Sequence, residues 1–318
     1  MKSNWVERLV PFVVVGSCVL CVTSSVDASK DNLPRWPGGV LLVGHLTEDL
    51  EVTVGEKTTQ IQGGGEWEVV PSISADGQVV ASARGVPNLP LESDPRFIVG
   101  TYTMGENGWR DYRGLEIKGG SVAISPDGSK LACSHMSVGP ALIHVLDLKT
   151  GKVMVGPETT KGSFLTWSPD SRRIAFNREV GADDGSTTLL PEIDVLEVAN
   201  GRVSKLADGT APSWSPSGEW IAFSDYSTFQ HGRYADTAYR VSLIHPDGTG
   251  SKVVLLLKGG DLFLPAVWSP DSKEFLLQRP QEDEVNPKVN ISVVDLATQN
   301  LTTKFRKTPE VYGWVTAR

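Results

Sequence analysis

An aromatic and charged cluster between residues 224 and 240 is the segment of this chain best suited to bind another molecule. It contains Tyr226, Phe229, His231, Arg233 and Tyr234. Aromatic and arginine side chains dominate the binding energy of many protein interfaces because they bury a large area at a small entropic cost. We therefore predict a binding site at these five residues. The alternative is that two or three of these side chains pack against the neighbouring part of the fold.

Metal binding is the second chemistry to consider. His135 and His231 could meet on one face, but two histidines are fewer ligands than a zinc site uses. The acidic segments 183–184 and 282–284 lack the alternating spacing of calcium ligands. We predict no metal and no other cofactor, and we interpret both acidic segments as solvated loops.

Catalytic motifs are the third chemistry to consider. The sequence contains no G-x-S-x-G nucleophile elbow, no P-loop and no H-E-x-x-H zinc motif. The recurring aspartates Asp127, Asp170 and Asp271 are typical of turns rather than of active sites. We predict no catalytic residue, and an enzyme stays an alternative.

A short turn that recurs five times indicates the scaffold that must position these residues. The copies read SADG, SPDG, SPDS, SPSG and SPDS, and they begin at Ser74, Ser125, Ser168, Ser215 and Ser269. Successive starts lie 51, 43, 47 and 54 residues apart, which is the length of one four-stranded propeller blade. Ser, Pro, Asp and Gly each suit their position in a type I turn.

Each turn lies between two short apolar runs of strand length. Around the third copy of the turn these runs are FLTW at 164–167 and RIAF at 173–176. A second hairpin follows, and in the same unit it reads IDVLEVANGRVSKL at 193–206, with an Asn-Gly turn. Four strands, A to D, therefore recur in each unit. We expect the tryptophans of the A strands to pack between blades; these are Trp167, Trp214, Trp268 and Trp314.

The two ends of the chain supply one further blade. Residues 311–318 resemble a strand A, while residues 38–44 resemble a strand B and residues 50–61 a C–D hairpin. We predict that the C-terminal strand joins the three N-terminal strands in one sheet, which closes a ring and removes an exposed edge. The fold class is therefore all-β: a six-bladed β-propeller of four-stranded antiparallel blades, closed by a composite N/C-terminal blade.

The combination of W-S-P-D-G, a short I-A-F strand and I-x-V-x-D-L resembles the TolB-type, WD-like propeller repeat over roughly residues 37–318. The resemblance implies a six-bladed propeller and, in full TolB proteins, a separate α/β domain before it. A mature N-terminus at Ser29 would lie only about ten residues before the first strand, so we expect that domain to be absent. We expect a short tail at 29–36 and a single propeller domain at 37–318.

The N-terminus has the pattern of a secretory signal peptide over residues 1–28. Two basic residues flank the start of an apolar segment at 9–22 that is too short for a comfortable membrane span, and Ala28 completes a cleavage site. We expect a periplasmic or secreted protein without a stable membrane span. A lipid anchor at Cys18 is the alternative, because residues 15–18 resemble a lipoprotein box, and an uncleaved anchor is a third reading.

The net charge limits the class of partner, and the cysteine content limits the redox chemistry. The formal net charge of the 318 residues is −8 at pH 7. An acidic chain disfavours a nucleic-acid partner, because the phosphate backbone is recognised through positive charge. Cys18 and Cys21 lie in the signal segment, so Cys133 remains as a single thiol in a strand, and we expect it to be buried.

The long segments between strands B and C are expected to form the functional face. The A–B turns are short and uniform, whereas long and dissimilar B–C segments occur at 84–96, 177–192, 224–240 and 278–288. Variable loops that a rigid ring holds over a central funnel are a usual layout of a binding site. We predict a non-catalytic propeller that binds an envelope or extracellular protein, or a glycan, through this face. The alternatives are a metal-dependent enzyme that acts on polysaccharide in the funnel, and a structural component of an envelope complex.

Overall fold

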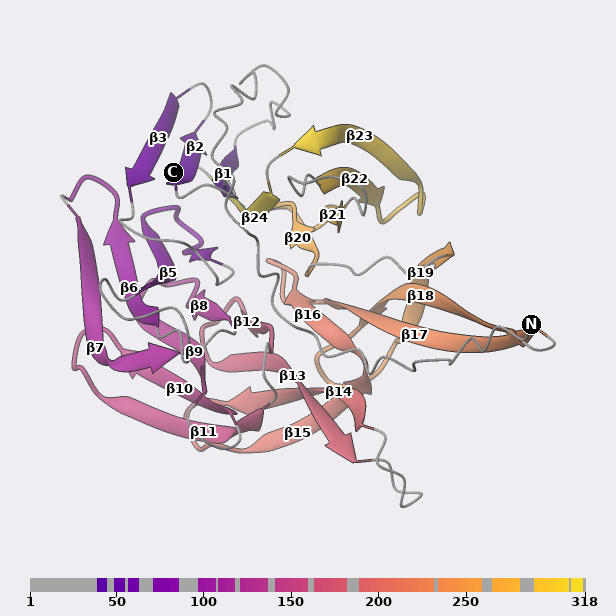
Figure 1. Cartoon of the computed structure of the whole chain (residues 1–318), viewed down its shortest axis with the longest axis horizontal. Helices are drawn as coiled ribbons and strands as arrows, with labels where there is room; N and C mark the ends of the chain where they lie inside the picture. Colours follow the sequence, from indigo (N-terminus) through magenta and orange to yellow (C-terminus); the bar gives the residue numbers. More distant parts are fainter. Residues whose placement is uncertain are drawn as a thin grey trace, which may run out of the picture.

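The computed structural model describes residues 39–44, 49–54, 57–62, 71–85, 97–106, 108–117, 121–136, 141–159, 163–181, 189–231, 234–258, 265–280, 289–308 and 310–316. Within these residues, six four-stranded antiparallel sheets surround a common centre (Figure 1). Each sheet is one blade, and its strands follow one another from the centre to the rim. This arrangement confirms the predicted all-β propeller.

Blades 2 to 4 follow one another along the chain. Blade 2 contains β4 (Ser72–Ile73), β5 (Val79–Gly85), β6 (Phe97–Thr103) and β7 (Trp109–Ile117). Blade 3 contains β8 (Val122–Ile124), β9 (Lys130–Met136), β10 (Ala141–Asp147) and β11 (Val153–Thr159). Blade 4 contains β12 (Leu165–Trp167), β13 (Arg173–Gly181), β14 (Leu189–Glu197) and β15 (Val203–Asp208).

Blades 5, 6 and 1 complete the ring. Blade 5 contains β16 (Thr210–Trp214), β17 (Ile221–His231), β18 (Tyr234–Ile244) and β19 (Lys252–Lys258). Blade 6 contains β20 (Val267–Trp268), β21 (Glu274–Pro280), β22 (Val289–Asp295) and β23 (Leu301–Thr308). Blade 1 joins β24 (Glu310–Thr316) to β1 (Gly39–Gly44), β2 (Asp49–Val54) and β3 (Lys57–Gln62).

The composite blade is confirmed by strand pairing. Strand β24 pairs antiparallel with β1, and Trp314 lies opposite Leu41. The innermost strands then contact one another in a closed cycle, from β4 through β8, β12, β16, β20 and β24 back to β4. The C-terminal strand therefore supplies the last link of the ring.

Hydrogen bonds between innermost strands fasten neighbouring blades to each other. The amide of Ile124 donates to Ser72 Oγ at 2.7 Å, and the amide of Leu165 donates to Ser121 Oγ at 3.1 Å. Between blades 5 and 6, Ser213 Oγ donates to the carbonyl of Ala266 at 2.6 Å. The bonds of Ser121 and Ser213 are buried, so each satisfies polar atoms that would otherwise be costly to remove from water.

The tryptophans of the A strands pack between blades as predicted where their side chains are described. Trp167 Nε1 donates to the carbonyl of Ala123 in the preceding blade at 2.9 Å, and Trp268 Nε1 donates to the carbonyl of Ser213 at 3.1 Å. Trp214 instead carries the Arg173 guanidinium of the preceding blade over its ring, at 4.9 Å from the centroid. The side chain of Trp314 lies outside the described residues.

The recurring turn has the expected hydrogen bonds. In blade 3, Ser125 Oγ donates to Asp127 Oδ1 at 2.6 Å and accepts from the amide of Lys130 at 2.8 Å. The fourth position needs a left-handed backbone, and Gly128 has a φ of 69° there. Serine takes this position in two copies, with φ values of 57° at Ser171 and 59° at Ser272.

Two of the four long B–C segments are strands wherever the structure describes them. Strand β13 stays paired with β14 up to Gly181 opposite Leu189, and β17 stays paired with β18 up to His231 opposite Tyr234. The prediction of loops is therefore wrong for residues 177–181 and 189–192, and for residues 224–231 and 234–240, which are paired strands that continue their blades. Residues 182–188, with the acidic pair 183–184, and residues 86–96, 232–233 and 281–288 lie outside the described residues.

Two further expectations concern the membrane and the thiol. Among the described residues, no helix has the length and apolar character needed to cross a membrane. Cys133 is free and buried, as predicted, and burial raises the pKa of its thiol to about 12. The signal segment 1–28, including Cys18, lies outside the described residues.

Candidate functional site

The β17–β18 hairpin is a ribbon that grows out of blade 5. Inside the blade, Ile221 and Phe223 are buried against blade 4. Strand β16 pairs with β17 only as far as Ser224, and β19 pairs with β18 only as far as Ala238. Beyond those positions the described strands pair only with each other, and the ribbon projects outward from the ring (Figure 1). The predicted cluster thus lies at the rim, not over the central funnel.

The register of the ribbon divides the predicted site between two faces. Neighbouring residues of a strand alternate between faces, and directly opposed residues share one. Phe229 lies two positions from His231, and His231 is opposite Tyr234. These three therefore share a face, whereas Tyr226 shares the other face with its partner Tyr239. Arg233 lies outside the described residues.

An ion pair closes the root of the ribbon. Asp225 and Arg240 are opposed in the register, and the Arg240 guanidinium donates to the Asp225 carboxylate. Ser242 Oγ donates to the second carboxylate oxygen of Asp225 at 3.1 Å. Because the Asp225 side chain is only 15% exposed, this charged bond is screened less than a surface pair. It fixes the two strands at the point where the ribbon leaves the blade.

Gly209 joins the roots of the ribbon and of the neighbouring hairpin. It is the single residue between β15 and β16, and its amide donates to the carbonyl of Pro191 on β14 at 2.9 Å. A Cβ atom at this position would lie 2.7 Å from the Ser224 carbonyl oxygen and 2.8 Å from the Phe223 ring. Only glycine allows blade 4 to connect this closely to β17.

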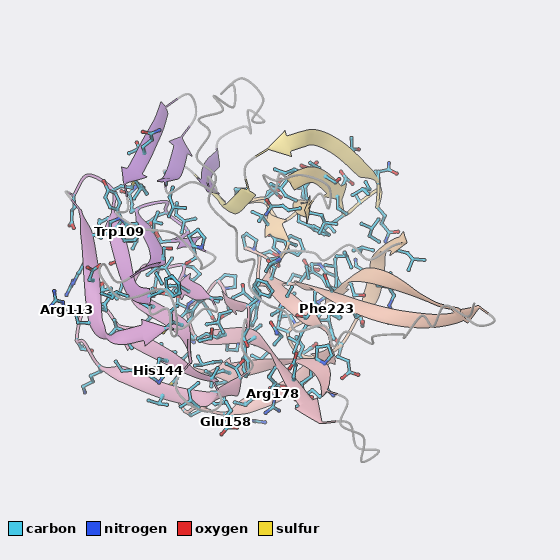
Figure 2. All side chains as sticks on the ribbon, in the orientation of Figure 1. Trp109, Arg113, His144, Glu158, Arg178 and Phe223 are labelled. Atoms are coloured by element: carbon cyan, nitrogen blue, oxygen red, sulfur yellow. The ribbon has the colours of Figure 1, made fainter. Side chains whose placement is uncertain are left out.

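A charged cluster occupies the root of the β13–β14 hairpin in blade 4. Arg178 Nη2 lies 2.7 Å from Glu192 Oε1, and Arg178 Nε lies 2.6 Å from Asp194 Oδ2. Lys205 Nζ contacts Glu192 Oε2 at 3.2 Å and Asp208 Oδ1 at 2.7 Å. Figure 2 shows Arg178 on blade 4 beside the blade that carries Phe223. The cluster links three strands of one sheet.

Burial sets the pKa of Asp194 within this cluster. Asp194 is fully buried, and neither carboxylate oxygen has a well-aligned hydrogen-bond donor, so the Arg178 contact is an ion pair without a directed bond. Removal from water raises the pKa of Asp194, and this effect outweighs the opposing attraction of Arg178. Sequence reasoning missed the cluster, although the alternation of Glu192 and Asp194 with Ile193 and Val195 places both acids on one sheet face.

The two histidines considered for metal binding lie in different blades. His135 is on β9 of blade 3 and His231 is at the end of β17 in blade 5, with blade 4 between them (Figure 1). The structure therefore does not bring them together. Over the part of the chain that is described, no group of three or more His, Cys, Asp or Glu side chains could hold a metal ion.

Comparison with known proteins gives the fold. No family model matches the chain. An uncharacterised protein of Agrobacterium fabrum is 26% identical over 157 residues, which are 44% of this chain and 51% of that protein. The match thus spans about half the length of this curated relative.

Solved structures of TolB resemble the propeller along most of its length. TolB from Acinetobacter baumannii has a TM-score of 0.59 at 16% identity, covering 88% of this chain and 68% of that chain. A protein assigned as TolB from Agrobacterium tumefaciens has a TM-score of 0.56 at 15% identity, covering 85% of this chain and 90% of that chain. The chain therefore has the TolB-type propeller fold. Because peptidases also contain this fold, the fold alone does not assign a function.

Proposed function

We propose that the chain is a periplasmic or secreted, non-catalytic propeller that binds an envelope or extracellular protein through the β17–β18 ribbon. The observation that carries the proposal is the pairing of β17 with β18 through His231 opposite Tyr234, well beyond the ends of β16 and β19. A projection of this kind, rich in aromatic residues, presents anchors that a partner can bury.

The root of the ribbon supports a binding role because it is fixed before any partner arrives. The Asp225–Arg240 ion pair ties its two strands to each other, and the close approach of Gly209 places β17 next to the end of blade 4. A segment that is already ordered loses less conformational entropy on binding than a loose loop. Less of the binding energy from contacts with the aromatic residues would therefore be lost in ordering the ribbon, and the affinity would be higher.

The two faces of the ribbon carry different aromatic residues, so the effect of substitutions shows which face the partner binds. A partner that docks on the face of Phe229 and Tyr234 leaves Tyr226 on the opposite side. Each anchor that is replaced by alanine is expected to cost about 1–2 kcal/mol, or roughly 5- to 30-fold in affinity. We propose that one face carries nearly all of this loss, because a single surface cannot contact both sides of a two-stranded ribbon at once.

The test uses the purified protein as bait on an envelope extract. One variant carries Phe229→Ala and Tyr234→Ala, and a second carries Tyr226→Ala and Tyr239→Ala. A matched control carries Thr228→Ala and Thr237→Ala, an opposed pair on the same ribbon. The proposal expects a partner that the parent and the control retain and one aromatic variant loses. Equal retention by all four proteins, with folding intact, would refute the ribbon as the site.

The same variants also distinguish three alternative functions. A glycan partner would be retained by the parent on glycan supports and lost with the same aromatic variant. A metal-dependent enzyme acting on polysaccharide would turn over its substrate in the presence of added divalent metal, and ribbon variants would leave that rate unchanged. A structural component of an envelope complex would bind over a broad surface and tolerate both aromatic variants.

A further inference from the structure

We propose that Asp194 is a proton-sensitive clamp on the β13–β14 hairpin: its carboxylate ties Arg178 to β14 at neutral pH, and its protonation on acidification releases this tie and loosens the hairpin. The proposal concerns blade 4 and does not depend on the binding role of the β17–β18 ribbon. It follows from where the charged cluster lies, from how few contacts hold Asp194, and from what surrounds it.

The cluster lies at the level where the hairpin leaves its blade. Strand β12 pairs with β13 as far as Leu165 opposite Phe176, and β15 pairs with β14 as far as Asp208 opposite Glu192. Arg178 lies two residues beyond Phe176 on β13 and is opposite Glu192 on β14. In the part of the chain that is described, residues 179–181 and 189–190 are therefore paired as strands only with each other and with Pro191, whose carbonyl also accepts from the Gly209 amide. The root at Arg178 is the place where a clamp would act.

One guanidinium serves two carboxylates at this root. Arg178 Nε donates to Glu192 Oε1 at 2.9 Å and also lies 2.6 Å from Asp194 Oδ2. Asp194 is 0% exposed, whereas Arg178 keeps 35% of its side-chain surface in solvent. The contact with Arg178 is thus what compensates the buried charge of Asp194. Loss of that charge would remove one of the two attachments of Arg178 to β14.

The groups around Asp194 favour proton uptake. From β14 itself, Glu192 repels its charge; from β13 and β15, Arg178 and Lys205 attract it. Asp208 of β15 pairs with Lys205 at the exposed end of the cluster, and β16, which packs on β13 and β14, carries no ionisable side chain. Burial is the largest effect, and it raises the pKa of Asp194 above its ordinary value of 3.8.

The sign of the effect follows from this raised pKa. The folded protein binds the Asp194 proton more tightly than the unfolded chain does, so this group contributes stability below the unfolded pKa and loses that contribution as pH rises through the folded pKa. Acidification therefore does not unfold the blade through Asp194. Release of Arg178 removes the attraction that lowers the pKa of the buried Asp194, so the released form holds the proton more tightly than the clamped form, and acid favours release while Arg178 stays paired with Glu192.

Hydrogen exchange of the hairpin amides tests the clamp. After correction for the intrinsic pH dependence of exchange, the amides of residues 179–181 and 189–190 should exchange about tenfold faster below the titration midpoint of Asp194 than at neutral pH, because the ion pair between Asp194 and Arg178 is lost. Asp194→Asn should exchange at the fast rate at both pH values. The control Asp208→Asn, in which an 81% exposed partner of Lys205 is changed, should keep the response of the parent.

Two outcomes would overturn the proposal. The first is a parent hairpin whose corrected exchange rates do not change with pH. The second is an Asp194→Asn variant that keeps the parental response. If that variant fails to fold, carbon-13 NMR titration of the Asp194 carboxyl group in the parent decides: a midpoint above 3.8 that is shared by the Arg178 Nε–H signal supports the clamp, and a midpoint at or below that value refutes it. None of these measurements involves a partner.

Discussion

Gly209→Ala is the substitution that most directly tests how the two hairpin roots are joined. The new Cβ atom would lie 2.7 Å from the Ser224 carbonyl oxygen and 2.8 Å from the Phe223 ring, and both belong to the buried part of β17. A forced contact of this kind costs about 1–3 kcal/mol. Gly209 also has a φ of 152°, a backbone conformation that costs a residue with a side chain about 1–3 kcal/mol. We expect a total loss of about 2–6 kcal/mol in the free energy of unfolding.

Urea denaturation, followed by tryptophan fluorescence, measures this loss as a shift of the unfolding midpoint at constant slope. Gly201→Ala is the matched control, because Gly201 has a φ of 73° and no atom within 4 Å of the added Cβ. It should cost only the conformational part, about 1–2 kcal/mol. If Gly209→Ala is no more destabilising than Gly201→Ala, then the close approach between blade 4 and β17 does not hold the hairpin roots.

Three further predictions concern the ring and the thiol. Trp167→Phe removes the indole hydrogen bond to the Ala123 carbonyl between blades 4 and 3, so the free energy of unfolding should fall by about 1–3 kcal/mol in urea titrations; no change would contradict the bridging role. Deletion of Val311–Arg318 removes the A strand of the composite blade and should lower the melting temperature by more than a typical point substitution does; a parental melting temperature would contradict closure by β24. Cys133 is buried and its pKa is raised to about 12, so it should resist thiol reagents at pH 8 in the native state and react after unfolding; rapid native labelling would contradict this.

Local turn chemistry explains why the propeller could be predicted from the sequence. The Ser-Pro-Asp-Gly turn forms its hydrogen bonds within itself, as Ser125 and Asp127 show. The same residue types therefore recur in each copy of the turn and can be recognised in the sequence. The composite blade followed from the same repeat, because the interval from Trp268 to Trp314 matches one blade. Features that are repeated and locally determined were therefore predicted correctly.

The two paired hairpins differ from the predicted loops because strand prediction depends on apolar alternation. Residues 225–231 read DYSTFQH, which has no such alternation, and their backbone pairing with β18 defines them as strand. The division of the predicted site between two faces depends on the same register. Tyr226 and Phe229 are close together along the sequence, which indicates a single cluster. Only the strand pairing of the ribbon shows that they lie on opposite faces.

The blade 4 cluster was missed for a related reason. Arg178 and Glu192 are separated by residues that include the hairpin end, and their contact requires the register that places them opposite each other. Asp194 lies in a run that otherwise reads as an ordinary core strand. Cross-strand charge pairs of this kind become visible when strand partners are known, not from spacing along the chain.

Photo-crosslinking from the ribbon is the most direct test of the proposed function. A photoreactive residue at Gln230 on β17 is compared, in the producing cell, with the same residue at Thr150, an exposed position in the turn between β10 and β11 of blade 3. The proposed function predicts a discrete crosslinked partner at position 230 and none at position 150. A partner captured from position 150 alone, or from neither position while the protein is folded and exported, would contradict binding through the β17–β18 ribbon.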